Sequence, residues 1–88
     1  MRETINEEVS VVMYYSAKKR LAMPRLISWQ NKDYTVDEVD YKHPVSEGKT
    51  LFHIFEFVDA QHSMWFRLKF NTSNLHWTLE AISDGNAN

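Results

Sequence analysis

The chain has 88 residues, a formal charge of −2 and no cysteine, which together exclude a disulfide framework, a Cys-based zinc site and a thiolate nucleophile. The chain contains ten Lys and Arg residues and twelve Asp and Glu residues, so nucleic-acid binding would need a local basic patch. Folding at this size buries only about 60 to 65% of the unfolded surface. The three Trp, four Tyr and five Phe are therefore expected mainly in a small core.

The two ends of the chain are polar and lack apolar residues to bury. We predict a disordered N-terminal tail over residues 1–7, a single β domain over residues 8–83 and a disordered C-terminal tail over residues 84–88. The start "MRETINEEVS" is acidic, whereas a signal peptide needs a basic start followed by an apolar run. No stretch approaches the ~20 apolar residues of a membrane span. The expectation is a soluble, cytoplasmic protein without membrane contact.

The segment "EEVSVVMYYSA" fits two structures. Its Val and Tyr content and its alternation favour a strand. A helix competes, because Thr4 and Glu7 form a capping box and Val9, Val12 and Met13 fall on one helical face. The strand is the preferred interpretation.

From residue 24 onward, alternating runs rich in aromatic and β-branched residues indicate strands. Between them, "DAQH" and "NTSN" have the length and polarity of hairpin loops, whereas "KHPVSEGK" is longer. The sequence therefore predicts an all-β fold, a small antiparallel meander that forms a strongly bent five- or six-stranded barrel or roll. The five runs are "PRLISWQ", "DYTVDEVDY", "TLFHIFEFV", "SMWFRLKF" and "LHWTLEAI".

The first two runs predict a hairpin. A tight turn at Asn31-Lys32 would place an apolar cross-strand cluster on one face, made of Ile27, Trp29, Tyr34 and Val36. In the second run the alternation changes phase, which a β-bulge near Asp37-Glu38 would explain. The run 50–58 is apolar on both faces, as expected for a central strand that is covered on both sides.

The last two runs assign residues to faces. Core positions are predicted to be Met64, Phe66, Leu68 and Phe70, followed by Leu75, Trp77, Leu79 and Ala81. Trp65, Arg67 and Lys69 point the other way, and either Arg67 or Lys69 could pair with Glu80 on the neighbouring strand.

No arrangement of residues predicts catalysis, a metal site or a cofactor site. The four His show no metal-ligand spacing, the Ser residues lie in no nucleophile elbow, and neither Gly belongs to a phosphate-binding loop. Asp37, Glu38 and Asp40 near His43 would need a pocket that shifts their pKa values. The expectation is a non-enzymatic protein.

Trp65, Arg67 and Lys69 form the candidate binding surface, with three interpretations. Trp65 could be covered by the N-terminal segment or by residues 42–49, with Arg67 across its ring. The same side chains suit a protein partner, because Trp and Arg anchor interfaces. They would also suit single-stranded nucleic acid, together with a basic patch of Lys18, Lys19 and Arg20. A protein partner is the leading functional hypothesis and a nucleic-acid or DNA-repair accessory role is the alternative.

A loose pattern covers residues 9–84 weakly: Pro24, Ile27 and Trp29, then Tyr34 and Val36, and finally Trp77, Leu79 and Glu80. It resembles a family of short bacterial domains of unknown function, in which a Pro-led strand ending in Trp precedes Tyr-x-Val and a final strand contains Trp-x-Leu-Glu. The family's turn tends to be Arg-Gly where this chain has Gln30-Asn31, so no basic turn carries over. The resemblance implies a non-enzymatic module, sometimes found near translesion polymerase proteins.

Overall fold

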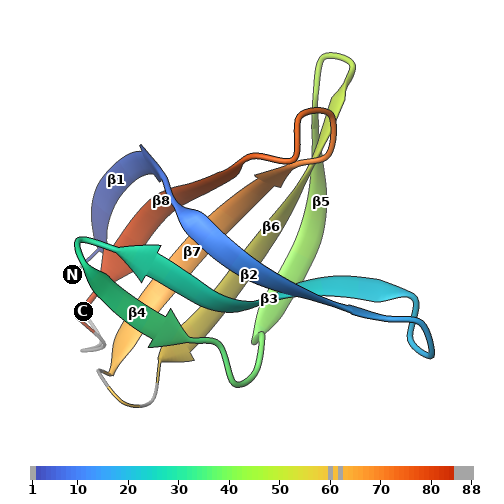
Figure 1. The fold of residues 1–88 in the computed structure, drawn as a ribbon. Helices are drawn as coiled ribbons and strands as arrows, with labels where there is room; N and C mark the ends of the chain where they lie inside the picture. The colour runs from blue at the N-terminus through green and yellow to red at the C-terminus, as the bar shows by residue number, and fades with distance from the viewer. Residues whose placement is uncertain (1, 60, 62, 85–88) are drawn as a thin grey trace.

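The computed structural model describes residues 2–59, 61 and 63–84, and within those residues it contains strands and no helix (Figure 1). The all-β prediction is therefore confirmed. The eight strands are β1 (Arg2–Glu8), β2 (Ser10–Ser16), β3 (Leu21–Trp29), β4 (Lys32–Thr35), β5 (Tyr41–Glu47), β6 (Thr50–Asp59), β7 (Met64–Asn71) and β8 (Trp77–Ser83).

The strands form two antiparallel sheets. The larger is five-stranded with the order β1-β8-β7-β6-β5, and the smaller is three-stranded with the order β2-β3-β4. Figure 1 shows the smaller sheet lying across one face of the larger one. The bent meander is as predicted, but the strands number eight instead of five or six and the sheets do not close into a barrel.

The N-terminal segment links the two sheets. β1 pairs with β8, and after the single residue Val9 the chain continues as β2, which pairs with β3. β1 contains a bulge between Thr4 and Glu7, where Asn6 has a φ of 53°. Such a bulge bends a strand sharply, which lets one segment serve both sheets.

These assignments correct one expectation at the N-terminus and confirm another. Residues 2–7, predicted as a disordered tail, belong to β1, whose Ile5 packs against the core. The segment after Val9 is a strand, so the preferred interpretation over a helix is correct. Of the predicted C-terminal tail, residues 85–88 lie outside the described residues.

The predicted hairpin forms as β3 and β4. Ile27 lies opposite Tyr34, and both are buried with Val36, while Trp29 packs against the same core. Trp29 pairs with Lys32, so the turn is Gln30-Asn31, one residue earlier than predicted. Both turn residues have positive φ, of 53° and 62°, which is the geometry of the type I′ turn that suits hairpin twist.

The predicted strand 33–41 does not exist as one element. β4 ends at Thr35 and the chain crosses to the larger sheet, where β5 begins at Tyr41. Residues near Asp37-Glu38 therefore form a crossover instead of a bulge. Residues 42–49, predicted as a loop, lie largely in β5, whose edge position tolerates Pro44 because an edge strand needs no donor on its open side.

The main core lies between the two sheets. Its buried side chains come from both sheets and are Ile27, Tyr34, Val36, Phe55, Phe57, Phe66, Leu68, Trp77 and Leu79. Leu75 and Ala81, predicted to face inward, do not join this cluster. Leu75 is exposed in the turn before β8, and a register shift between β7 and β8 places Ile82 on the core side instead.

Candidate functional site

The predicted binding surface lies on the outer face of the five-stranded sheet, the face turned away from the core. Along β7, Phe66 and Leu68 are buried in the core, so the alternating Trp65, Arg67 and Lys69 project outward. The prediction of outward orientation is therefore correct for all three. None of the three is fully exposed, since each is partly covered by neighbouring side chains.

Trp65 is partly covered by the side chain of Arg2, which reaches over it from β1 of the same sheet. The guanidinium carbon of Arg2 lies 4.2 Å from the centre of the Trp65 ring, within the range of a cation–π interaction. The cation over the ring is thus Arg2 and not Arg67 as the sequence predicts, and it comes from a strand of the same sheet and not from a segment that lies over Trp65. The open part of this region is Val58, which lies opposite Trp65 on β6 and is 44% exposed.

Arg67 is held between two carboxylates instead. Its Nη1 donates to Oε2 of Glu56 at 2.8 Å, and its Nε donates to Oε1 of Glu80 at 3.0 Å. The predicted pairing with Glu80 is thus confirmed. The side chains of the two glutamates are only 16% and 24% exposed, so these ion pairs are more shielded from water than typical surface pairs.

Lys69 is also engaged. Its Nζ donates to both carboxylate oxygens of Glu47, at 3.0 and 3.1 Å, and lies 4.1 Å from the centre of the Phe52 ring. Beside it, Ile54 is buried although it belongs to the outer face. The outer face therefore combines paired charges with an apolar cluster.

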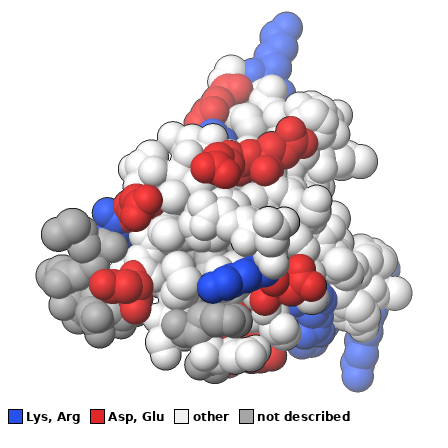
Figure 2. Space-filling model, turned by 60° about the vertical axis from the view of Figure 1, so that its left-hand side comes forward, with Lys and Arg blue, Asp and Glu red and all other residues white. Residues whose placement is uncertain are grey.

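Lys18, Lys19 and Arg20 occupy the exposed turn between β2 and β3. This turn lies at the opposite end of the molecule from the start of β7 (Figure 1), so the structure does not bring the basic patch together with Trp65. On the face seen in Figure 2, Lys and Arg side chains are scattered among Asp and Glu groups and form no continuous basic stripe among the described residues.

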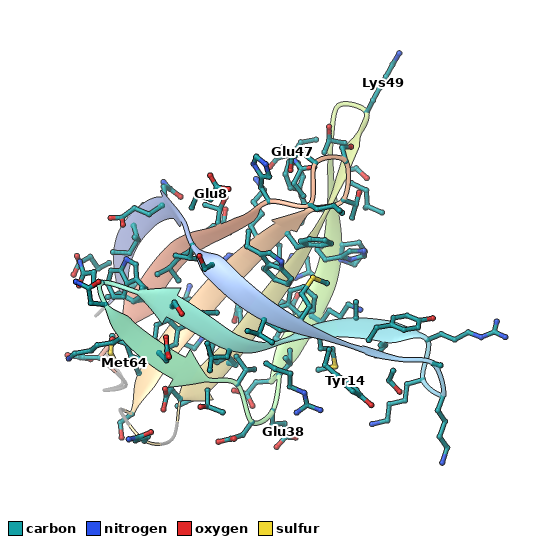
Figure 3. All side chains as sticks on the ribbon, in the orientation of Figure 1. Glu8, Tyr14, Glu38, Glu47, Lys49 and Met64 are labelled. Atoms are coloured by element: carbon teal, nitrogen blue, oxygen red, sulfur yellow. The ribbon has the colours of Figure 1, made fainter. Side chains whose placement is uncertain are left out.

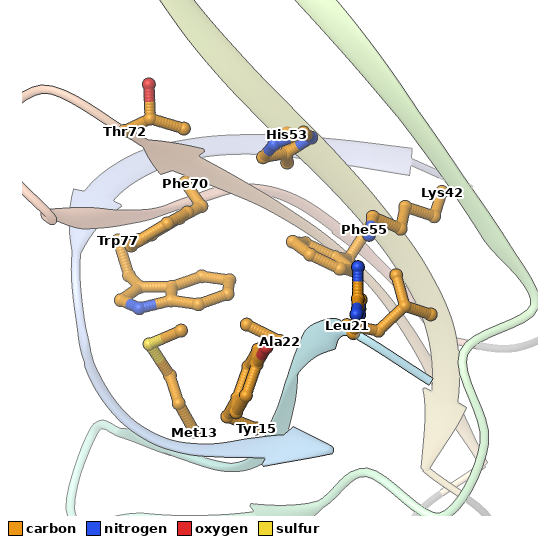
Figure 4. Close-up of a pocket in the computed structure, with 11 residues that line it drawn as sticks. Met13, Tyr15, Leu21, Ala22, Lys42, His53, Phe55, Phe70, Thr72 and Trp77 are labelled. Carbon is orange, nitrogen blue, oxygen red and sulfur yellow. The ribbon is translucent and has the colours of Figure 1, made fainter. Parts of the chain in front are cut away.

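A cleft that the sequence analysis did not predict opens on the inner face of the same sheet (Figure 4). Its volume is about 390 Å³. The far half of the β2–β3 hairpin forms one wall and the five-stranded sheet forms the other. The lining residues are Met13, Tyr15, Arg20, Leu21, Ala22, Lys42, His53, Phe55, Phe70, Thr72 and Trp77.

The apolar side of the cleft is aromatic. The Trp77 ring lies 4.5 Å from Phe70 and 5.4 Å from Phe55, measured between ring centres. Figure 4 shows these three rings from β6, β7 and β8 facing Met13 and Tyr15 of β2 across the cleft. The cleft therefore offers flat apolar surfaces on two sides.

The charged residues of the lining are cations. Arg20 and Lys42 border the cleft, no Asp or Glu of the described residues lines it, and the Lys42 Nζ lies 5.5 Å from the centre of the Phe55 ring. Burial, and secondarily the charge of Lys42, lower the pKa of His53 below its ordinary value of 6.5. Its Nδ1 is buried and has no hydrogen-bond partner among the described residues.

Sequence reasoning could not have found this cleft from a local motif, because its lining comes from β2, β3, β5, β6, β7 and β8 and the turns beside them. Two further features bear on function. Within the described residues no group of three or more His, Asp or Glu is placed to hold a metal ion. Nor does that part of the chain form a helix with the length and apolarity needed to cross a bilayer.

Comparison of the chain with protein-family models, with curated proteins and with solved structures finds no match. The resemblance to short bacterial domains therefore stays a prediction.

Proposed function

We propose that the protein is a non-enzymatic interaction module that binds a protein partner on the outer face of its five-stranded sheet. The observation that carries this proposal is an apolar cluster on a sheet face that no other sheet of the described chain covers. Val58, opposite the half-buried Trp65, is 44% exposed, and Tyr41, opposite Glu56 on the same face, is 50% exposed. Antiparallel sheets that face water usually carry polar side chains on that face.

The surroundings of the cluster also suit a protein. Trp, Tyr and Arg are the residue types enriched at protein interfaces, and all three occur here as Trp65, Tyr41 and Arg67. Three cations, Arg2, Arg67 and Lys69, and three carboxylates, Glu47, Glu56 and Glu80, lie together on this face, so their charges balance. A neutral, partly apolar surface favours another protein surface of similar character.

The same ion pairs weigh against single-stranded nucleic acid on this face. Phosphate binding draws its affinity from cations that exchange counterions for phosphates, whereas Arg67 and Lys69 already have carboxylate partners. Lys18, Lys19 and Arg20 lie at the tip of a different element. Single-stranded nucleic acid is therefore the less favoured ligand of this face, and the experiment below distinguishes it from a protein.

The experiment compares two exposed apolar residues in matched variants. Val58→Glu introduces a charge on the outer face, opposite Trp65, and Leu75→Glu introduces the same charge in the turn before β8. Both residues are exposed, so both variants should keep the thermal unfolding midpoint of the parent chain. A protein crosslinked to the parent chain in cell extract and identified by mass spectrometry should be retained by Leu75→Glu and lost by Val58→Glu.

Purified partner then gives the decisive measurement. Its affinity should fall at least about tenfold with Val58→Glu, which corresponds to loss of one well-buried interface contact. Equal affinity for both variants would contradict the proposal. So would binding of an oligonucleotide, but not of a protein, that weakens steeply with salt.

A further inference from the structure

We infer that the inner cleft is a binding site for a small amphipathic anion, a carboxylate carried on an apolar chain or ring. This site lies on the opposite face of the sheet from the proposed protein surface. It is built from different residues, so either proposal can fail without the other.

The size of the cleft fits a small molecule. Its volume of about 390 Å³ lies within the range of roughly 300 to 1,000 Å³ that is usual for ligand pockets. Such pockets are mainly apolar and contain a few polar groups that orient the ligand. Here Met13, Phe55, Phe70 and Trp77 supply the apolar part, and the close ring contacts of Trp77 keep those surfaces in place.

The charge of the lining selects an anion. Arg20 and Lys42 both border the cleft, and no carboxylate of residues 2–59, 61 and 63–84 lines it, in a chain whose formal charge is −2. Neither cation forms an ion pair within the described part of the chain. An anionic headgroup would therefore gain charge-assisted hydrogen bonds without displacing an existing carboxylate.

His53 adds a neutral polar group beside these cations. Because its pKa is lowered, the imidazole is uncharged at neutral pH and can donate from a ring nitrogen to a carboxylate. Figure 4 shows His53 and Phe55 on one strand with Lys42 beside them, while Trp77 lies farther along the cleft. The headgroup is thus placed near Lys42 and the apolar body near Trp77.

The hairpin forms the less supported wall of the cleft. β4 pairs only with residues 26–29 of β3, so the half of the hairpin that contains Met13 and Ala22 has no third strand. Two-stranded ribbons are marginally stable on their own, so this wall of the cleft is held by fewer strand pairings than the wall formed by the five-stranded sheet.

The test uses anilinonaphthalene sulfonate as a fluorescent probe and dodecanoate as its competitor, below the concentration at which dodecanoate forms micelles. The probe should bind saturably at one site, and dodecanoate should displace it. Dodecanol and dodecyltrimethylammonium have the same chain with a neutral or cationic head. They should bind at least about tenfold more weakly, the difference expected for one charge-assisted hydrogen bond.

Matched variants assign the site. Lys42→Glu should weaken dodecanoate at least about tenfold, whereas Lys49→Glu, at the solvent-exposed tip of the β5–β6 turn (Figure 3), should leave its affinity unchanged. Ala22→Phe should fill the cleft and abolish displacement. Because the larger side chain in Ala22→Phe could also disturb β3, the unfolding midpoint of this variant is compared with that of the parent chain. Lys42→Glu tests the same site at a residue outside the core.

Three results would overturn the inference. One is equal affinity for dodecanoate and dodecanol, another is unchanged binding in Lys42→Glu, and the third is loss of binding in Val58→Glu, which would place the probe on the outer face. Retained partner binding in Lys42→Glu and Ala22→Phe would separate this site from the proposed protein surface.

Discussion

The two faces of the five-stranded sheet differ in whether their cations have carboxylate partners. On the outer face Arg67 lies between Glu56 and Glu80 and is bonded to both. On the inner face Arg20 and Lys42 border a cleft that no carboxylate in the described part of the chain lines. A cation whose partner belongs to the same chain contributes to the fold, whereas a cation without one stays available to a ligand. The number of basic residues on a surface is therefore a poor guide to what that surface binds.

Strand alternation is what makes two such surfaces compatible. Neighbouring residues of β6 serve opposite faces, with His53 and Phe55 toward the cleft and core and Ile54 and Glu56 toward the outside. Since successive side chains point to opposite faces, a substitution on one face leaves the other largely intact. The comparison can thus be tested one face at a time.

The largest expected effect comes from the core that supports both faces. Phe66 is fully buried and contacts Phe57 and Tyr34, with ring centres 5.2 and 4.8 Å apart. Phe66→Ala should lower the free energy of unfolding by about 3 to 5 kcal/mol, because it removes apolar contacts and leaves a cavity. Urea denaturation followed by Trp fluorescence measures the change.

The exposed Leu75 provides the control for that experiment. Leu75→Ala should change the free energy of unfolding by no more than about 0.5 kcal/mol. If Phe66→Ala were equally mild, the two sheets would not share the core described above, and the two faces could not be treated as sides of one rigid sheet.

Removal of one cation from each face tests the contrast directly. Arg67→Met leaves Glu56 and Glu80 close together without their cation, and should lower the free energy of unfolding by about 1 to 3 kcal/mol. Lys42→Met removes a charge that has no carboxylate partner among the described residues. It should change the free energy of unfolding by no more than about 0.5 kcal/mol. Both are compared by urea denaturation at low salt.

A second substitution checks the cause of the Arg67 effect. Glu56→Gln should recover part of the lost stability in the Arg67→Met background, because one of the two unpaired charges is then removed. Equal losses from Arg67→Met and Lys42→Met would mean that pairing does not distinguish the two faces.

The more exposed ion pair on the outer face should matter less. Lys69 bonds to Glu47, whose side chain is 55% exposed. Since water and salt screen such pairs, Glu47→Gln should lower the free energy of unfolding by about 0 to 1 kcal/mol. The same denaturation series at high salt should reduce this difference further. If Glu47→Gln lowered the free energy of unfolding as much as Arg67→Met does, the contribution of an ion pair would not depend on its burial.

The smallest expected effect is a pH dependence of the inner face. Burial and Lys42 lower the pKa of His53 in the folded chain. As the pH falls, the His53 imidazole is therefore protonated at a higher pH in the unfolded chain than in the folded chain. The contribution of His53 to stability is thus fully present above the ordinary pKa of 6.5. It is lost as the pH falls from there through the lowered folded-state pKa.

The other titratable or charged groups of the lining are Tyr15 on β2, Arg20 beside β3 and Lys42 on β5, and none of them is a carboxylate. Unfolding midpoints measured from pH 7.5 down to about 5, the window around the ordinary pKa of His, should therefore decrease. The decrease should be smaller in His53→Gln. It should persist in His76→Gln, a change at an exposed position outside the cleft. If the unfolding midpoint of His53→Gln fell with pH as much as that of the parent chain, His53 would not be the cause of the pH dependence.

Regular alternation accounts for what the sequence predicts well. In β7 every second residue is apolar, so Phe66 and Leu68 are assigned to the core and Trp65 to the outside, as the structure has them. The β3–β4 cluster around Ile27 and Tyr34 is predicted for the same reason. Its turn is misplaced by one residue because Gln30-Asn31 and Asn31-Lys32 are both short polar pairs.

The remaining errors arise where local sequence carries no information on pairing partners. A phase change near Asp37-Glu38 fits a bulge as well as a crossover to another sheet, and only the partner strands distinguish them. β1 is polar because most of its side chains are exposed, so only Ile5 signals its burial against the core. The cleft joins residues that are distant along the chain, such as Met13 and Trp77, which no local spacing rule connects.

The pairing of β1 with β8 has a consequence for synthesis on the ribosome. The five-stranded sheet is completed only when Arg2 meets Ser83 and Glu8 meets Thr78, which joins the first described strand to the last. Contacts this far apart along the chain slow folding, because the intervening segment loses loop entropy before it gains native contacts. Until β8 emerges, β1 and β7 lack the strand that lies between them, and both leave unpaired edges open to other chains. The nascent chain is therefore expected to depend on protection from aggregation until its last strand is made.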